Sequence, residues 1–125
     1  MNSLVKIPTG EQLSTHFKDY EFACRCCGKY ITPPDELLQV LEQIRHAYSA
    51  PVVITSGYRC PAHNKNVGGA THSRHIVGDA VDIKVSNVDA IDVYATADTL
   101  VGGSGGVGKY PTWVHIDWRG YRARW

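Results

Sequence analysis

The chain has 125 residues, a length that suits one domain with a sizeable core but not two. Its 13 basic and 12 acidic side chains give a formal net charge of +1, which argues against nucleic-acid binding through a broad positive field. No apolar run approaches the roughly 18 residues that a membrane helix needs. We therefore expect one soluble domain, a monomer, that binds no nucleic acid and does not insert into a membrane.

The N-terminal residues 1–31 show little helical periodicity and contain three of the cysteines. We expect them to form an arm or a short helical turn packed on a core made by residues 32–125. The N-terminus also lacks a charged segment followed by an apolar one, the pattern of a signal peptide. This predicts synthesis in the cytoplasm, so that a substrate outside the inner membrane would be reached only after release.

A helix is predicted to follow this arm. Thr32 is its expected N-cap, and Pro33 fits its first turn. Apolar side chains then recur at helical spacing until Ala50-Pro51 ends the pattern, and we expect them to face the core: Leu37, Leu41, Ile44 and Tyr48.

Two strands and a long loop come next. Residues 52–55 are short, β-branched and apolar, which predicts a buried strand. Residues 56–78 have no periodicity, and a loop of that length in a small domain usually carries function. Residues 80–85 alternate between apolar and polar side chains and predict a second strand.

The last third of the chain predicts one helix and a strand meander. Residues 86–89 offer a cap and an acid for a helix that ends before Gly102-Gly103. The glycine-rich run 102–108 is expected to turn into a strand, and residues 113–118 alternate cleanly. The basic, aromatic end at 118–125 favours a last strand with solvated arginines over a nucleic-acid contact. This order of elements predicts an α+β fold with a mainly antiparallel sheet.

Two of these strands carry candidate metal ligands. A catalytic zinc takes three protein ligands and keeps one position open. Alternation places Ala80 and Asp82 on one face of their strand, and the small Ala80 leaves room for a metal. His115 and Asp117 likewise share a face of the later strand. The sheet can therefore offer Asp82 and His115 to one point, with His75 approaching from the loop.

Several motifs span nearly the whole chain, from about Phe17 to Trp125. They are Ser56-Gly-Tyr-Arg59, Asn64, Val67-Gly-Gly-Ala70, Ser73-x-His75 followed by Asp82, and Tyr110-Pro-Thr-Trp-Val-His115-Ile-Asp117. This pattern resembles the zinc D,D-carboxypeptidases and the L,D- or D,D-endopeptidases of bacterial cell walls, which share their fold with the Hedgehog signalling domain. It looks closest to the compact single-domain branch of phages, prophages and some periplasmic murein hydrolases. The resemblance implies a zinc peptidase domain at 32–125, with ligands His75, Asp82 and His115.

The resemblance also implies roles around the metal. Arg59 would bind the substrate carboxylate or the developing oxyanion, for which its planar fork of donors is suited, and Ser73 would hydrogen-bond the substrate or a ligand. Several branches carry an acid as general base three residues before His115, where this chain has Thr112. Threonine cannot accept a proton near neutral pH, so Asp117 becomes the candidate catalytic base. Its alternative role is to orient a histidine ligand.

The cysteines form a second pattern. Cys24-x-x-Cys27 and Cys60-x-x-His63 have the spacing of a structural zinc site with three cysteines and one histidine. One or two disulfides are an alternative outside the reducing cytoplasm. Free thiols packed under the arm are the third.

The expected function is zinc-dependent hydrolysis of a peptide bond next to a D-amino acid in peptidoglycan stem peptides, by a D,D-carboxypeptidase or an endopeptidase. An endolysin, that is a phage or prophage lysis enzyme, or a virion-associated component fits best. One alternative is a cellular D-Ala-D-Ala carboxypeptidase or dipeptidase. Another is a non-catalytic, zinc-bound Hedgehog-like module that binds a partner, which Thr112 in place of an acid leaves open.

Overall fold

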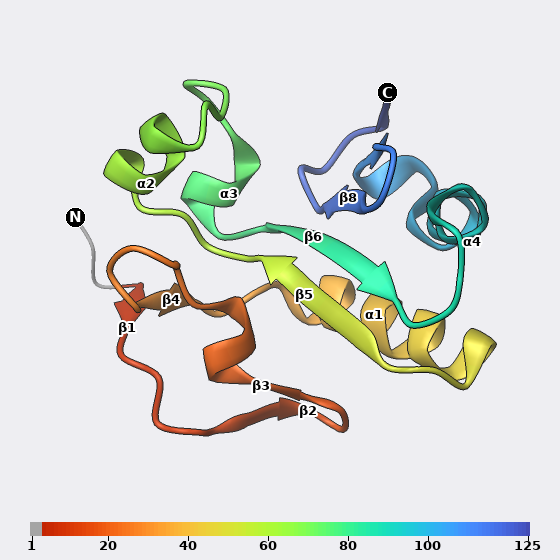
Figure 1. Cartoon of the computed structure of the whole chain (residues 1–125), viewed down its shortest axis with the longest axis horizontal. Helices are drawn as coiled ribbons and strands as arrows, with labels where there is room; N and C mark the ends of the chain where they lie inside the picture. Colours follow the sequence, from red (N-terminus) through yellow and green to blue (C-terminus); the bar gives the residue numbers. More distant parts are fainter. Residues whose placement is uncertain (1–3) are drawn as a thin grey trace.

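The computed structural model describes residues 4–125 and is built on a five-stranded sheet with strand order β5-β6-β8-β7-β9 (Figure 1). Neighbouring strands are antiparallel except β7 and β9, which are parallel. The predicted α+β fold with a mainly antiparallel sheet is therefore confirmed. The strands are β5 (Val52–Ser56), β6 (Ala80–Val85), β7 (Gly106–Lys109), β8 (Val114–Asp117) and β9 (Ala123–Arg124).

The N-terminal segment forms two small two-stranded sheets and a 3₁₀ turn beside the main sheet (Figure 1). Phe17, Phe22 and Tyr30 are buried in the same hydrophobic cluster as the sheet residues. The segment thus contributes to the core, while the division at residue 31 stays a prediction and residues 1–3 lie outside the described part. Its elements are β1 (Val5–Lys6), β2 (Gln12–Ser14), β3 (Phe17–Lys18), η1 (Asp19–Phe22) and β4 (Tyr30–Ile31).

Two long helices accompany the sheet, α1 (Asp35–Tyr48) and α4 (Ala90–Val101), and η2 (Gly102–Ser104) follows α4. The predicted N-cap at Thr32 is wrong, because α1 begins only after Pro34. A residue before a proline is pushed out of the helical region, so the Pro33-Pro34 pair delays the start. No helix within residues 4–125 combines the length and apolar character needed to cross a bilayer.

The sheet has one apolar and one polar face. Val81 of β6 and Val114 and Ile116 of β8 are at most 1% exposed and belong to the cluster that α1 and α4 cover. Side chains alternate along a strand, so Asp82 and His115 face the other way. The polar face is the one that the segment between β5 and β6 approaches, with α2 and α3 above it in Figure 1.

Residues 56–78 are not one irregular loop, as the missing periodicity predicted, because they contain two short helices. Each is fixed by a side chain at its start: the Cys60 sulfur accepts the N–H of His63, and the Ser73 hydroxyl accepts the N–H of His75. Helices of this length have too few turns to show an apolar stripe. They are α2 (Pro61–Asn66) and α3 (Arg74–Val77).

The glycine-rich run forms β7, as expected, and its glycines make room for the polar face. A Cβ on Gly106 would lie 2.6 Å from Oδ2 of Asp117, and one on Gly108 would lie 2.4 Å from the indole nitrogen of Trp125. Both distances are shorter than a carbon can tolerate. The run therefore excludes side chains so that Asp117 and Trp125 can pack against the strand.

The prediction of solvated C-terminal arginines is wrong for two of them. Arg124 donates to the carbonyls of Gly102, Gly105 and Ala123 and pairs with Asp98, so that only 14% of its side chain is exposed. Arg119 is bound to a buried carboxylate on β8. These guanidinium groups stabilise the end of the sheet.

Candidate metal centre and cleft

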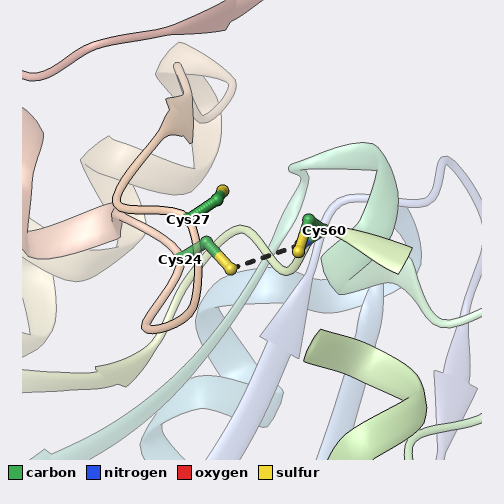
Figure 2. Close-up of side chains that lie close together, drawn as sticks. All are labelled: Cys24, Cys27 and Cys60. Carbon is green, nitrogen blue, oxygen red and sulfur yellow. Dashed lines mark hydrogen bonds between the residues drawn. The ribbon is translucent and has the colours of Figure 1, made fainter. Parts of the chain in front are cut away.

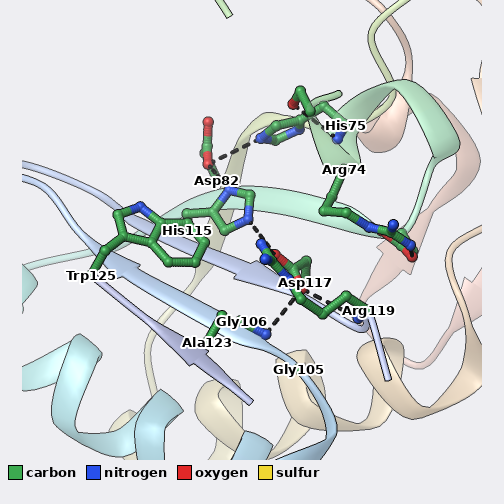
Figure 3. Close-up of polar contacts among 12 residues, drawn as sticks. Arg74, His75, Asp82, Gly105, Gly106, His115, Asp117, Arg119, Ala123 and Trp125 are labelled. Carbon is green, nitrogen blue, oxygen red and sulfur yellow. Dashed lines mark hydrogen bonds and ion pairs between the residues drawn. The ribbon is translucent and has the colours of Figure 1, made fainter. Parts of the chain in front are cut away.

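Three side chains meet on the polar face of the sheet. Asp82 and His115 are direct partners across the β6–β8 pair, and His75 reaches them from α3 (Figure 3). One ligand atom from each lies within 4.8 Å of the other two. Each residue is at most 7% exposed. The structure thus brings together the three predicted zinc ligands.

Hydrogen bonds fix how the two histidines face Asp82. Nδ1 of His75 lies 2.8 Å from the carbonyl of Gly57, and Nε2 of His115 lies 2.8 Å from Oδ2 of Asp117. These acceptors assign the proton to those nitrogens. The other nitrogens, Nε2 of His75 and Nδ1 of His115, then point lone pairs at Oδ1 of Asp82 from 3.2 and 3.1 Å. Lone pairs and a carboxylate that face one another repel unless a cation, either a proton or a metal ion, lies between them, and this donor set fits zinc.

Asp82 is ready to act as an anionic ligand. Burial raises the pKa of its carboxyl, but its close contacts with the rings of His115 and His75 outweigh burial and hold the pKa well below the usual range. The carboxylate is therefore ionised at neutral pH, as metal binding requires.

Asp117 is completely enclosed. Its Oδ1 accepts hydrogen bonds from the backbone N–H of Gly106 at 2.9 Å and from Nε of Arg119 at 2.9 Å, and its Oδ2 accepts one from Nη2 of Arg119 at 2.7 Å (Figure 3). Burial raises the pKa of Asp117, but Arg119 and His115 outweigh burial and lower it. With no exposed surface and a weakened basicity, this geometry favours the alternative role, orienting His115, over the predicted role of catalytic base.

Arg119 was not identified from the sequence as part of this site. Strand alternation gives no signal for it, because β8 ends at Asp117 and Arg119 lies two residues beyond that end. Its guanidinium also lies 5.2 Å from the Trp125 ring, whose centroid is 5.1 Å from that of His115. Arg119 therefore contacts both the Asp117 carboxylate, which lies behind His115, and the Trp125 ring, which packs against His115.

Arg59 is placed beside the metal centre by its own motif. Its Nε donates to Ser56 at 3.1 Å and its Nη1 to the buried Asn64 at 3.2 Å. Nη2 lies 3.3 Å from Oδ2 of Asp82, the oxygen that does not face the histidines. With 16% of its side chain exposed, the fork is held in place and borders the space above the metal centre.

That space is a cleft of about 670 Å³. Ser73, another predicted site residue, is half-buried at its wall, whereas Thr112 is exposed and does not line it. Aromatic rings from the last quarter of the chain form much of the rim, which the sequence did not indicate. The lining residues are Arg59, Val67–Ala70, His72–His75, Asp82, Tyr110, Trp113, His115, Arg119, Tyr121 and Trp125.

A second cluster lies where the N-terminal segment meets α2. The sulfur atoms of Cys24, Cys27 and Cys60 lie within 4.8 Å of one another, and all are free thiols (Figure 2). His63, the fourth residue of the predicted site, is not among the converging groups. Burial raises the pKa of Cys24, but N–H groups of Cys27, Cys60 and Cys26 outweigh it and lower the pKa to about 7.

Comparison with known proteins agrees with the resemblance expected from the motifs. The chain is 36% identical over 76 residues to the probable peptidoglycan L,D-endopeptidase MepK of Haemophilus influenzae, which covers 55% of this chain and 40% of that protein. It is 43% identical over 44 residues to the zinc D-Ala-D-Ala carboxypeptidase of Streptomyces albus G, covering 34% of this chain and 17% of that protein. The chain thus matches less than half the length of either relative. The profile of the peptidase M15 family matches residues 15–117, a span that includes the metal centre, and the chain belongs to this family.

Proposed function

We propose that the protein is a zinc peptidase that hydrolyses a peptide bond next to a D-amino acid in peptidoglycan stem peptides. The observation that carries the proposal is the convergence of His75, Asp82 and His115 at the floor of a cleft that Arg59 borders. The names of the two relatives support the substrate class, since one is a peptidoglycan endopeptidase and the other a D-Ala-D-Ala carboxypeptidase.

Each site residue has a role that its contacts support. His75, Asp82 and His115 would hold the zinc, which when bound polarises a carbonyl and lowers the pKa of water. Arg59 offers its fork to the substrate carboxylate or to the developing oxyanion. The Ser73 oxygen accepts the N–H of His75, so its hydroxyl hydrogen is free to point to the substrate.

Asp117 acts behind the metal centre as a positioning residue. It accepts the Nε2 proton of His115 and so presents Nδ1 to the metal. Arg119 keeps the carboxylate in that orientation.

Cleavage products distinguish the possible activities. Zinc-loaded protein is incubated with intact peptidoglycan, with cross-linked muropeptides and with a pentapeptide that ends in D-Ala-D-Ala, and the products are identified by mass spectrometry. Release of D-alanine from the pentapeptide indicates a carboxypeptidase, and loss of cross-links indicates an endopeptidase. Cleavage of none of the three by protein that contains zinc would refute the proposal and support the non-catalytic binding module. The phage or prophage origin stays a prediction.

Two histidine variants test whether cleavage depends on the metal centre. His115→Ala removes a ligand and should abolish cleavage. His46→Ala changes an exposed histidine on α1, outside the cleft, and should leave cleavage unchanged.

A further inference from the structure

The cysteine cluster joins two segments that are far apart in sequence. Cys24 and Cys27 lie in the turn between η1 and β4, and Cys60 is the N-cap of α2 (Figure 2). The turn is tight, because the N–H of Gly28 donates to the carbonyl of Cys24 at 2.9 Å and Gly28 has a φ of 73°. This brings the two sulfurs of the Cys-x-x-Cys pair to the same side, facing Cys60.

Backbone N–H groups surround these sulfurs. The N–H groups of Cys26 and Cys60 each lie 3.4 Å from Sγ of Cys24 (Figure 2 draws the second), and the N–H of His63 lies 3.5 Å from Sγ of Cys60. Such contacts favour a sulfur that carries negative charge, which is the form that binds metals.

We propose that Cys24, Cys27 and Cys60 bind a structural zinc ion, with His63 as the fourth ligand. A tetrahedral zinc with Zn–S bonds of about 2.3 Å places its sulfurs about 3.8 Å apart. The three sulfurs already lie within 4.8 Å of one another, so only a small inward movement is needed.

His63 is the residue that the Cys60-x-x-His63 spacing offers to complete the tetrahedron. It lies on the first turn of α2, three residues after Cys60, and its backbone already contacts the sulfur of Cys60. Binding would require its ring to turn toward the cluster by rotation about side-chain bonds. Cys26 lies between the two ligands of the turn, is exposed and has its thiol in contact with that of Cys60, so it is the competing candidate for the fourth position.

The three-way convergence distinguishes zinc from a disulfide. A disulfide would join two of the sulfurs and leave the third thiol unused beside the bond. Zinc uses all three and joins the N-terminal segment to the residue that follows Arg59. This site shares no ligand with the proposed catalytic centre, so each can be tested without the other.

Metal content of the full-length protein, purified in reductant, tests the proposal. Wild type should contain two zinc equivalents, His115→Ala one, Cys27→Ser one, and the double variant none. Cys27 is preferred to Cys24 for substitution because Cys24 is buried. As an independent readout, cobalt added to His115→Ala after removal of its zinc should produce the intense near-ultraviolet sulfur-to-cobalt band, and this band should be absent from the double variant treated in the same way.

The fourth ligand is tested by a matched pair. His63→Ala should weaken cobalt binding at this site at least tenfold, and Cys26→Ser should change it less than twofold. The opposite pattern would overturn the assignment of His63. A single zinc equivalent in wild type that persists in Cys27→Ser would overturn the site itself. So would a disulfide in place of the second zinc, seen as a mass lowered by two hydrogens in protein purified without reductant.

Discussion

Replacing Asp117 by asparagine tests whether this residue positions His115 or acts as the base. The amide has the same shape but only one acceptor oxygen. Whichever way it turns, its NH₂ group faces a donor, either Nε2–H of His115 or the N–H groups of Gly106 and Arg119. Loss of an outer partner of a metal-bound histidine typically lowers metal affinity about 10- to 100-fold, or about 1.4 to 2.8 kcal/mol.

The assay measures turnover of a muropeptide as a function of free zinc. For a positioning residue, Asp117→Asn should raise the zinc concentration that gives half-maximal turnover about 10- to 100-fold. Turnover at saturating zinc should be affected much less. Asp98→Asn is the control, since it changes a carboxylate that is also held by arginines but does not line the cleft, and it should leave the zinc dependence unchanged.

A different outcome would refute this reasoning. If the zinc dependence of Asp117→Asn is unchanged while turnover at saturating zinc falls about 10²- to 10⁴-fold, the residue acts as a general base. The enclosed geometry of Asp117 would then open in the substrate complex.

Three further predictions concern other parts of the structure. Arg59→Lys should lower kcat/KM at least about tenfold with little change in bound zinc, because one ammonium group cannot replace a fork with three contacts; steady-state kinetics and metal analysis check this. Gly106→Ala should cost about 1 to 3 kcal/mol in unfolding free energy, since its Cβ would contact Asp117, whereas Gly103→Ala meets no atom and should change it little; urea unfolding measures both. Burial raises the pKa of Glu42, but hydrogen bonds from the β2–β3 turn outweigh burial and lower it. Its contribution to stability is therefore present above the ordinary glutamate pKa and lost as the pH falls through the lowered value, so Glu42→Gln should flatten the loss of stability in acid.

Most of the metal centre could be predicted from the sequence, because strand alternation is a local property. The alternation in residues 80–85 and 113–118 was enough to place Asp82 and His115 on matching faces. Their direct pairing depends on the register of β6 against β8, which no local pattern specifies.

Other features depend on contacts between distant segments. The helix starts at Asp35 because Pro33 and Pro34 delay it, whereas the cap pattern at Thr32 predicts an earlier start. The burial of Asp117 depends on Arg119 and on the absence of a side chain at Gly106, so its role could not be separated from that of a base by spacing alone. Likewise, the meeting of Cys60 with the N-terminal turn required the fold.

The two carboxylate oxygens of Asp82 face different partners. Metal binding at the centre therefore affects the ion pair between Asp82 and Arg59. Oδ1 faces His75 and His115, and Oδ2 faces the arginine. A dication at the centre draws on the same negative charge that attracts the guanidinium, so metal binding weakens the hold of Asp82 on Arg59. The positive charge of Arg59 is then less neutralised by Asp82, so it attracts an incoming anionic group more strongly. Binding of metal and binding of an anionic substrate should therefore be cooperative, with the metal-free protein a poor receptor for an anionic group at Arg59.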